Sequence, residues 1–250
     1  MKKNQKQSLI KNVFFTILFS ISCMYTVVAQ EMRNEINLST GISLPLVTYD
    51  YASGNVASNG SNFYFNYGRV VKRFDKKYFT INAKYLSVSN SYSLMGSDIE
   101  ELNSNSQLIS LSGEWSGSAD KFKMSSYLVG FGFHSYLSKN KKFISYLKTY
   151  IGNATLTSPN LDYISENGYK IKVSELKNSN IIYNFNGGIS YEIYKNLSLG
   201  FNIDYSKSSF NYDAQKVIYS GINGASTDTI NPYSLDYSTL NLNTELILKF

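Results

Sequence analysis

The sequence predicts an all-β protein in which antiparallel strands follow one another along the chain. Apolar and polar residues alternate with a period of two in many segments, as they do in strands with one apolar and one polar face. Beyond residue 30 no window has a convincing apolar period of 3.6 residues. The chain contains 22 tyrosines, 15 phenylalanines and only 3 prolines. This composition favours strands.

The first 29 residues differ from the rest of the chain. A cationic head precedes an apolar stretch, residues 13–28, and the small residues Val27 and Ala29 follow the order of a cleavage site. The sequence therefore predicts a signal peptide over residues 1–29 and a single domain over residues 30–250. The apolar stretch is shorter than the ~20 residues of a membrane anchor. A lipoprotein cleaved at Cys23 is the other alternative, although no leucine stands at the usual place before it.

Removal of the predicted signal peptide changes the charge of the protein. The full chain has 24 basic and 18 acidic residues, a net charge of +6. The peptide contains four lysines and no acidic residue, which leaves 20 basic against 18 acidic residues and a net charge of +2. Nucleic-acid binding therefore loses its main support. The one cysteine also leaves with the peptide, so no disulfide is expected.

Eight strands are predicted after residue 30. The clearest pair is a hairpin with a tight turn at Lys195 and Asn196. The predicted strands are 36–44, 63–71, 79–85, 127–137, 143–151, 181–193, 197–205 and 240–250.

The connections between the predicted strands alternate in length. Long connections cover 45–60, 90–124, 157–179 and 211–238, and short turns cover 72–77, 138–142 and 194–196. Both chain ends then lie at the short-turn end. This layout predicts a closed antiparallel up-and-down barrel of the kind that crosses outer membranes.

One segment leaves the strand count open. Residues 108–115 alternate like a strand, and a ninth strand would place the chain ends on opposite sides. Either this segment and residues 122–124 form a hairpin beyond the membrane, or a further strand near 163–173 makes ten. Eight strands are the favoured count.

The polar faces of the predicted strands consist mainly of Asn, Ser, Thr and Gly, whereas the apolar faces contain large Tyr, Phe, Leu and Ile side chains. A water-facing exterior normally has many charged residues. We therefore expect the apolar face to contact lipid and the polar face to fill the interior. The alternative is a soluble or surface-held, lipocalin-like barrel that binds an apolar ligand. Four charged residues at inward positions are expected to pair across a plugged lumen: Lys84, Lys148, Asp204 and Glu245.

The last predicted strand, 240–250, has apolar residues at alternate positions and ends in an aromatic residue. It resembles the terminal strand of outer-membrane barrels. The chain as a whole resembles the small OmpX-like and OmpW-like barrels of the porin-family type found in Gram-negative cell envelopes. The resemblance implies an outer-membrane location, with outer-membrane lipids and lipopolysaccharide as partners. It also implies insertion by the barrel-assembly machinery with periplasmic chaperones, with Leu246, Leu248 and Phe250 as an assembly signal.

The sequence provides little support for catalysis. His134 is the one histidine, and its neighbour Ser135 faces the opposite side of the strand. A packed interior histidine is expected. Neither a metal site nor a cofactor is expected, and the acidic residues Asp98, Glu100 and Glu101 are interpreted as a solvated loop. The predicted function is a monomeric structural, surface-interaction or narrow-channel barrel without enzymatic activity, with a lipid-modifying barrel enzyme as the alternative.

Overall fold

The computed structural model describes residues 34–46, 50–51, 54–55, 57–92, 115–165, 168, 170–221, 224–230 and 232–250. The predicted signal peptide lies outside the described residues, as do the acidic residues between 98 and 101 and most of the 108–115 segment.

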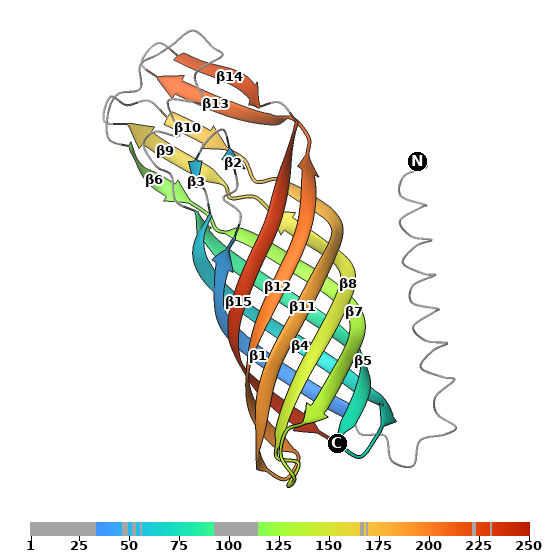
Figure 1. The fold of residues 1–250 in the computed structure, drawn as a ribbon. Helices are drawn as coiled ribbons and strands as arrows, with labels where there is room; N and C mark the ends of the chain where they lie inside the picture. The colour runs from blue at the N-terminus through green and yellow to red at the C-terminus, as the bar shows by residue number, and fades with distance from the viewer. Residues whose placement is uncertain are drawn as a thin grey trace, which may run out of the picture. The chain divides into compact units, whose positions relative to one another are not determined.

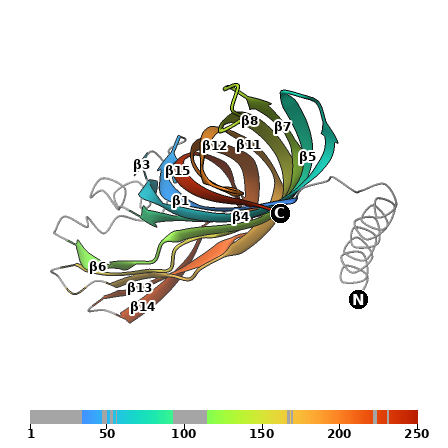
Figure 2. The same ribbon diagram turned by 90° about the horizontal axis from the view of Figure 1, so that it is seen from below.

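Eight antiparallel strands form a closed ring in the order β1-β15-β12-β11-β8-β7-β5-β4 (Figures 1 and 2). The predicted eight-stranded barrel is therefore confirmed. The ring strands are β1 (Asn34–Pro45), β4 (Ala57–Arg73), β5 (Lys77–Tyr92), β7 (Phe122–Tyr136), β8 (Phe143–Thr157), β11 (Lys177–Tyr194), β12 (Leu197–Tyr212) and β15 (Tyr233–Lys249).

Three short turns join ring strands at one end of the barrel, which is called the turn end below. They connect β4 to β5, β7 to β8 and β11 to β12. In the last of these, Asn196 has a φ of 70°, a left-handed conformation that asparagine tolerates better than most residues. The C-terminus also lies at this end (Figure 1). The predicted hairpin turn at Lys195 and Asn196 is confirmed.

The ring closes between its first and last strands. β1 pairs with β15 from Glu35 and Lys249 to Pro45 and Thr239. Beyond this register, the backbone N–H of Asn34 donates to the carbonyl of Phe250 at 2.6 Å, and the N–H of Phe250 donates to the carbonyl of Asn34 at 2.9 Å. Two residues at opposite ends of the described chain thus complete the ladder of backbone hydrogen bonds.

A second sheet lies at the opposite end, the loop end. It contains β6 (Trp115–Ala119), β9 (Leu161–Ser165), β10 (Lys170–Val173), β13 (Gln215–Gly221) and β14 (Gly224–Ile230) in the order β14-β13-β10-β9-β6. Each strand is connected by a few residues to a ring strand, and the order repeats the ring order β15-β12-β11-β8-β7. The sheet therefore continues five ring strands without closing (Figure 1). A two-residue pair, β2 (Asp50–Tyr51) with β3 (Gly54–Asn55), also lies between β1 and β4 in the chain.

Both alternatives for the ninth predicted segment need correction. Trp115 begins β6, but β6 pairs with β9 and not with residues 122–124. Residues 122–124 belong to ring strand β7, because they continue the inward alternation of that strand. The 163–173 region forms parts of β9 and β10 in the second sheet, so it adds no strand to the ring.

The wall of the barrel reverses its polarity along single strands. In β12, Leu199, Phe201 and Ile203 face outward and are about half exposed, whereas Asn202 and Asp204 face inward and are buried. Toward the loop end of the same strand the pattern is opposite. There the outward positions are Lys207, Ser209 and Asn211, and the inward positions are Phe210 and Tyr212.

The same reversal occurs on the other side of the ring. In β5, the outward series of Phe79 and Ile81 changes to Ser87 and Ser89, while the inward series of Asn82 and Lys84 changes to Leu86 and Val88. The half of the barrel near the turns, the turn half, therefore has an apolar exterior and a polar interior. The half near the loop end, the loop half, has a polar exterior and an apolar interior.

Candidate functional site

The polar interior of the turn half is built around a buried ion pair between Lys84 and Asp204. Both side chains have a relative exposure of 0%. The Asp204 carboxylate also accepts hydrogen bonds from the amides of Asn184 at 2.6 Å, Asn186 at 3.1 Å and Asn241 at 3.3 Å. The Lys84 ammonium donates to the Asn184 carbonyl oxygen at 3.0 Å. These contacts join four strands of the ring across the lumen.

A second ion pair joins the first ring strand to β8. The Lys148 ammonium donates to the Glu35 carboxylate at 2.8 Å, and both side chains are buried. His134 Nε2 lies 3.8 Å from the same carboxylate. The Lys148 ammonium also lies 4.9 Å from the centroid of the Tyr146 ring, a distance at which a cation is attracted to the face of an aromatic ring.

Glu245 is held by hydrogen bonds from neutral groups. Its carboxylate accepts from the hydroxyl of Tyr146, from the hydroxyl of Tyr64 at 2.9 Å and from the amide of Asn37 at 3.4 Å. The buried carboxylate is thus supplied with donors by three strands. Such donors offset part of the desolvation cost of a buried charge.

The four charged residues selected from the sequence all lie inside the barrel, but their pairing differs from the expected arrangement. Lys84 pairs with Asp204, whereas Lys148 pairs with Glu35 in place of Glu245. Sequence reasoning missed Glu35 because the first strand was predicted to begin at Ile36. Glu35 continues the inward series of Asn37 and Ser39, so the alternation contained the signal.

His134 is packed against neighbouring side chains inside the barrel. Its ring stacks on Tyr78 with centroids 4.3 Å apart, and its Nε2 lies 3.2 Å from the Thr80 hydroxyl. Ser135 is on the other face of β7, so the adjacent residues form no Ser and His pair. The side chain has a relative exposure of 2%, which leaves it little access to a substrate.

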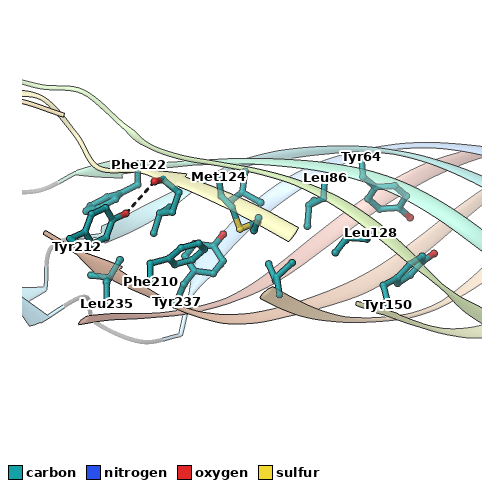
Figure 3. Packing of buried hydrophobic residues seen from close by; sticks show 14 residues of the cluster. Tyr64, Leu86, Phe122, Met124, Leu128, Tyr150, Phe210, Tyr212, Leu235 and Tyr237 are labelled. Atoms are coloured by element: carbon teal, nitrogen blue, oxygen red, sulfur yellow. Dashed lines mark hydrogen bonds between the residues drawn. The ribbon is translucent and has the colours of Figure 1, made fainter. Parts of the chain in front are cut away.

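The interior of the loop half is mainly apolar, which corrects the prediction that polar residues fill the whole lumen. Phe210, Leu86, Leu156 and Ile182 are fully buried there. Figure 3 shows Phe210 beside Tyr237, and Leu86 farther along the barrel toward Tyr64 and Leu128. The apolar layer consists of Tyr64, Leu86, Val88, Phe122, Met124, Leu128, Tyr150, Ala154, Leu156, Ile182, Phe210, Tyr212, Leu235 and Tyr237.

Two tyrosines connect the two parts of the interior. The rings of Tyr64 and Tyr150 belong to the apolar layer, and the Lys84 ammonium lies 4.2 Å and 5.1 Å from their centroids. The Tyr64 hydroxyl bonds Glu245, and the Tyr150 hydroxyl donates to Asn66 at 3.1 Å. Side chains therefore fill the described lumen from the turn half into the loop half, as expected for a ring of eight strands.

The residues proposed as an assembly signal lie on the outer face at the turn end. Leu246, Leu248 and Phe250 have relative exposures of 41%, 46% and 54%. Ile247, between them, faces inward and is buried. The last strand thus presents a row of apolar side chains on its outer face.

The part of the chain that the structure describes contains neither a cluster of metal-binding side chains nor a membrane-spanning helix. Its residues contain no group of three or more His, Cys, Asp or Glu side chains that would hold a metal ion. In the same residues, no helix has the length and apolar character needed to cross a bilayer.

A closed ring of eight antiparallel strands with a filled lumen and an apolar outer band is the architecture of a small outer-membrane β-barrel. The fold predicted from the resemblance to OmpX-like barrels is therefore confirmed. No protein-family model matches the chain, and no curated protein matches it.

Several solved structures are similar to the chain. The outer membrane protease OmpT from Escherichia coli has 9% identity and a TM-score of 0.48 over 89% of this chain and 98% of that one. A major outer membrane protein from Thermus thermophilus has 8% identity and a TM-score of 0.43 over 88% and 100% of the two chains. Neisserial surface protein A has 13% identity and a TM-score of 0.38 over 88% and 97%.

Proposed function

We propose that the chain is a sealed, non-catalytic barrel of the outer membrane that presents a β-sheet in water at its loop end. The reversal of wall polarity is the observation that carries this proposal. In the turn half of β12, an apolar exterior extends over about nine residues, near the 9–11 that a tilted strand needs to cross a bilayer. In the loop half, the polar exterior and apolar interior are those of a barrel surrounded by water.

The apolar exterior of the turn half argues against the soluble, lipocalin-like alternative. Tyr127, Phe131 and Leu147 are 72%, 70% and 58% exposed on neighbouring strands of the ring. Soluble monomers rarely expose contiguous apolar patches larger than a few hundred Å². In a lipid environment the same side chains need no protein partner, and the closed ladder satisfies the backbone. Outer-membrane lipids and lipopolysaccharide are accordingly the proposed partners of this surface.

The proposed location is tested by cell fractionation and by gel migration. The protein is expected in the outer-membrane fraction after export and removal of residues 1–29. It is also expected to migrate differently when unheated, because a closed barrel resists detergent. Recovery in a soluble periplasmic fraction would contradict the membrane assignment.

We expect the purified protein to leave planar bilayers without large, persistent conductance. The buried ion pairs and the apolar layer fill the lumen in both halves. Single-channel recording of the refolded full chain provides the measurement, with an open porin in the same chamber as the positive control. Stable open levels after verified insertion would show that the lumen conducts.

The absence of catalysis is proposed from the burial of the candidate groups. His134, Glu35 and Lys148 have relative exposures of 1–2% in the residues described, so a substrate would have to displace packed neighbours to reach them. The lipid-modifying alternative is tested by analysis of lipid A after deletion of the protein. Deletion would then alter the acylation pattern of lipid A. Restoration of the normal pattern by the wild-type chain, but not by a variant with a substituted His134, would support that alternative.

The sheet at the loop end is the proposed interaction surface. By strand register, Lys170, Lys172 and Ile218 share one of its faces, and all three side chains are exposed. Trypsin added to intact cells is expected to cleave after these lysines if the sheet projects from the cell surface. Protection in intact cells, with cleavage after lysis, would place the sheet on the other side of the membrane.

Deletion of Phe250 is expected to reduce the amount of protein in the outer membrane several-fold while folding into detergent remains nearly normal. The deletion removes two backbone hydrogen bonds to Asn34 and an exposed ring, which is a small part of the ladder. Assembly should suffer more, because we propose that the assembly machinery recognises the terminal aromatic residue. Phe250→Tyr retains the ring and is the control. Normal membrane levels of the deletion variant would show that Phe250 is not needed for assembly and is only a side chain on the outer surface.

A further inference from the structure

An aromatic groove lies on the outer surface of the barrel beside the turn between β4 and β5. Phe79 and Phe133 are directly opposite each other on neighbouring strands, with ring centroids 5.3 Å apart. Phe74, in the turn, meets Phe79 edge-on with centroids 6.2 Å apart. These three rings line an open groove of about 530 Å³ together with Asp75, Lys76 and Lys77. All three rings are between one third and one half exposed.

The groove is rimmed by positive charge. The Lys77 ammonium lies 5.7 Å from the centroid of Phe133, and the Lys72 ammonium lies 5.1 Å from that of Phe74. The one carboxylate in the lining, on Asp75, is paired with Lys141 of the neighbouring turn at 3.1 Å. The local balance is therefore cationic, and two of the cations lie close to the aromatic rings of the groove.

The groove lies where the apolar outer band of the turn half ends. If the barrel spans a membrane as proposed above, this level coincides with the headgroups of the leaflet on the turn side. A lipid there would have its phosphate near the lysines and the first part of its acyl chain against the rings. Lysine near a membrane surface contributes an attraction to anionic lipid, and aromatic rings favour the interfacial level.

We propose that the groove formed by Phe74, Phe79, Phe133, Lys76 and Lys77 is a binding site for an anionic glycerophospholipid of the leaflet on the turn side. This inference rests on the proposed membrane-spanning function. The anionic headgroup is chosen over a zwitterionic one because the rim is cationic and its carboxylate is already paired. An acyl-linked phosphate is chosen over a free anion because three of the six lining residues are phenylalanines.

The site is tested with the full chain refolded into phosphatidylcholine nanodiscs that contain a small, fixed fraction of photoactivatable phosphatidylglycerol. Mass spectrometry of the crosslinked peptides identifies the residues in contact with its acyl chain. Photoactivatable phosphatidylcholine is the control lipid. The variant Lys76→Gln with Lys77→Gln removes two charges at the groove. Its matched control, Lys139→Gln with Lys142→Gln, removes two exposed charges from the turn between β7 and β8.

Phosphatidylglycerol crosslinks are expected to concentrate on peptides containing Phe79 and Phe133. The groove variant should lower their yield roughly fivefold or more, because each lysine near the surface contributes about a fivefold preference for anionic lipid. The control variant should leave the yield near that of the wild type. An equal loss in both variants would overturn the site in favour of general attraction to basic turns. Equal labelling by the two lipids would also overturn it.

Failure of the proposed function has a different outcome. A chain that does not insert into nanodiscs, judged by heat-dependent gel migration, would contradict the membrane-spanning barrel itself. An inserted barrel without phosphatidylglycerol preference at the groove would contradict only the lipid site. Competition by soluble glycerol phosphate at the groove would also count against it, because it would define a site for a free anion.

Discussion

Replacement of Asp204 by alanine is expected to destabilise the folded barrel by about 3–5 kcal/mol, since the change leaves the Lys84 charge buried without its partner. Three asparagine amides would lose an acceptor at the same time. Denaturant unfolding of the refolded protein in lipid vesicles, followed by gel migration of the unheated sample, measures the loss.

An exposed ion pair provides the matched control for Asp204. Asp75 and Lys141 are 81% and 53% exposed, so Asp75→Ala should cost about 0–1 kcal/mol. The double change Asp204→Leu with Lys84→Met removes both buried charges and should recover much of the loss caused by Asp204→Ala. Equal effects of Asp204→Ala and Asp75→Ala would mean that the interior pair is hydrated and contributes no more than a surface contact.

Replacement of Phe210 by alanine is expected to destabilise the barrel by about 3–5 kcal/mol through a cavity in the apolar layer. Phe210 is fully buried and meets Tyr237 edge-on with ring centroids 6.1 Å apart. Denaturant unfolding under the same conditions measures the effect. Phe210→Leu, which keeps most of the volume, should cost less than about 1.5 kcal/mol. A loss below about 1 kcal/mol for the alanine variant would indicate a loop half that opens without disturbing the rest of the ring.

The eight ring strands were predictable because their turn halves follow one simple rule. The outer face is apolar and a narrow polar lumen lies behind the other face, so apolar and polar residues alternate without interruption, as from Leu197 to Tyr205. The sequence predicts all eight strands and the three short turns correctly. Burial of Lys148 also followed from the cost of a charge that faces lipid.

The loop halves were not predicted because the alternation changes its phase within a strand. In β12 the apolar residues stand at odd positions up to Tyr205 and at even positions from Phe210. A pattern with a fixed phase therefore ends the strand too early and assigns the rest to a loop. The same effect hid the inward positions of Phe122 and Met124 in β7, which one of the two alternatives placed in a hairpin outside the ring.

The pairing of the interior charges was less predictable than their burial. Alternation places Glu245 inside the ring, and the cost of a charge that faces lipid places Lys148 there. The partner of each charge, however, depends on the stagger between strands. Glu35 and Lys148 are 113 positions apart, and no local pattern relates them. The second sheet was hard to predict for the same reason. Its strands are short, and their order depends on the ring strands from which they continue.

Pairing of the first ring strand with the last determines when the ring can close. Glu35 lies opposite Lys249, so β1 cannot pair with its second neighbour until residues 233–249 have been synthesised. Until then, both strands have unpaired backbone edges, which are prone to association with other chains. Contacts between residues so distant in sequence also form slowly. Closure of the ring is therefore a late step in folding. In an incomplete chain that lacks β15, β1 has only one of its two neighbouring strands.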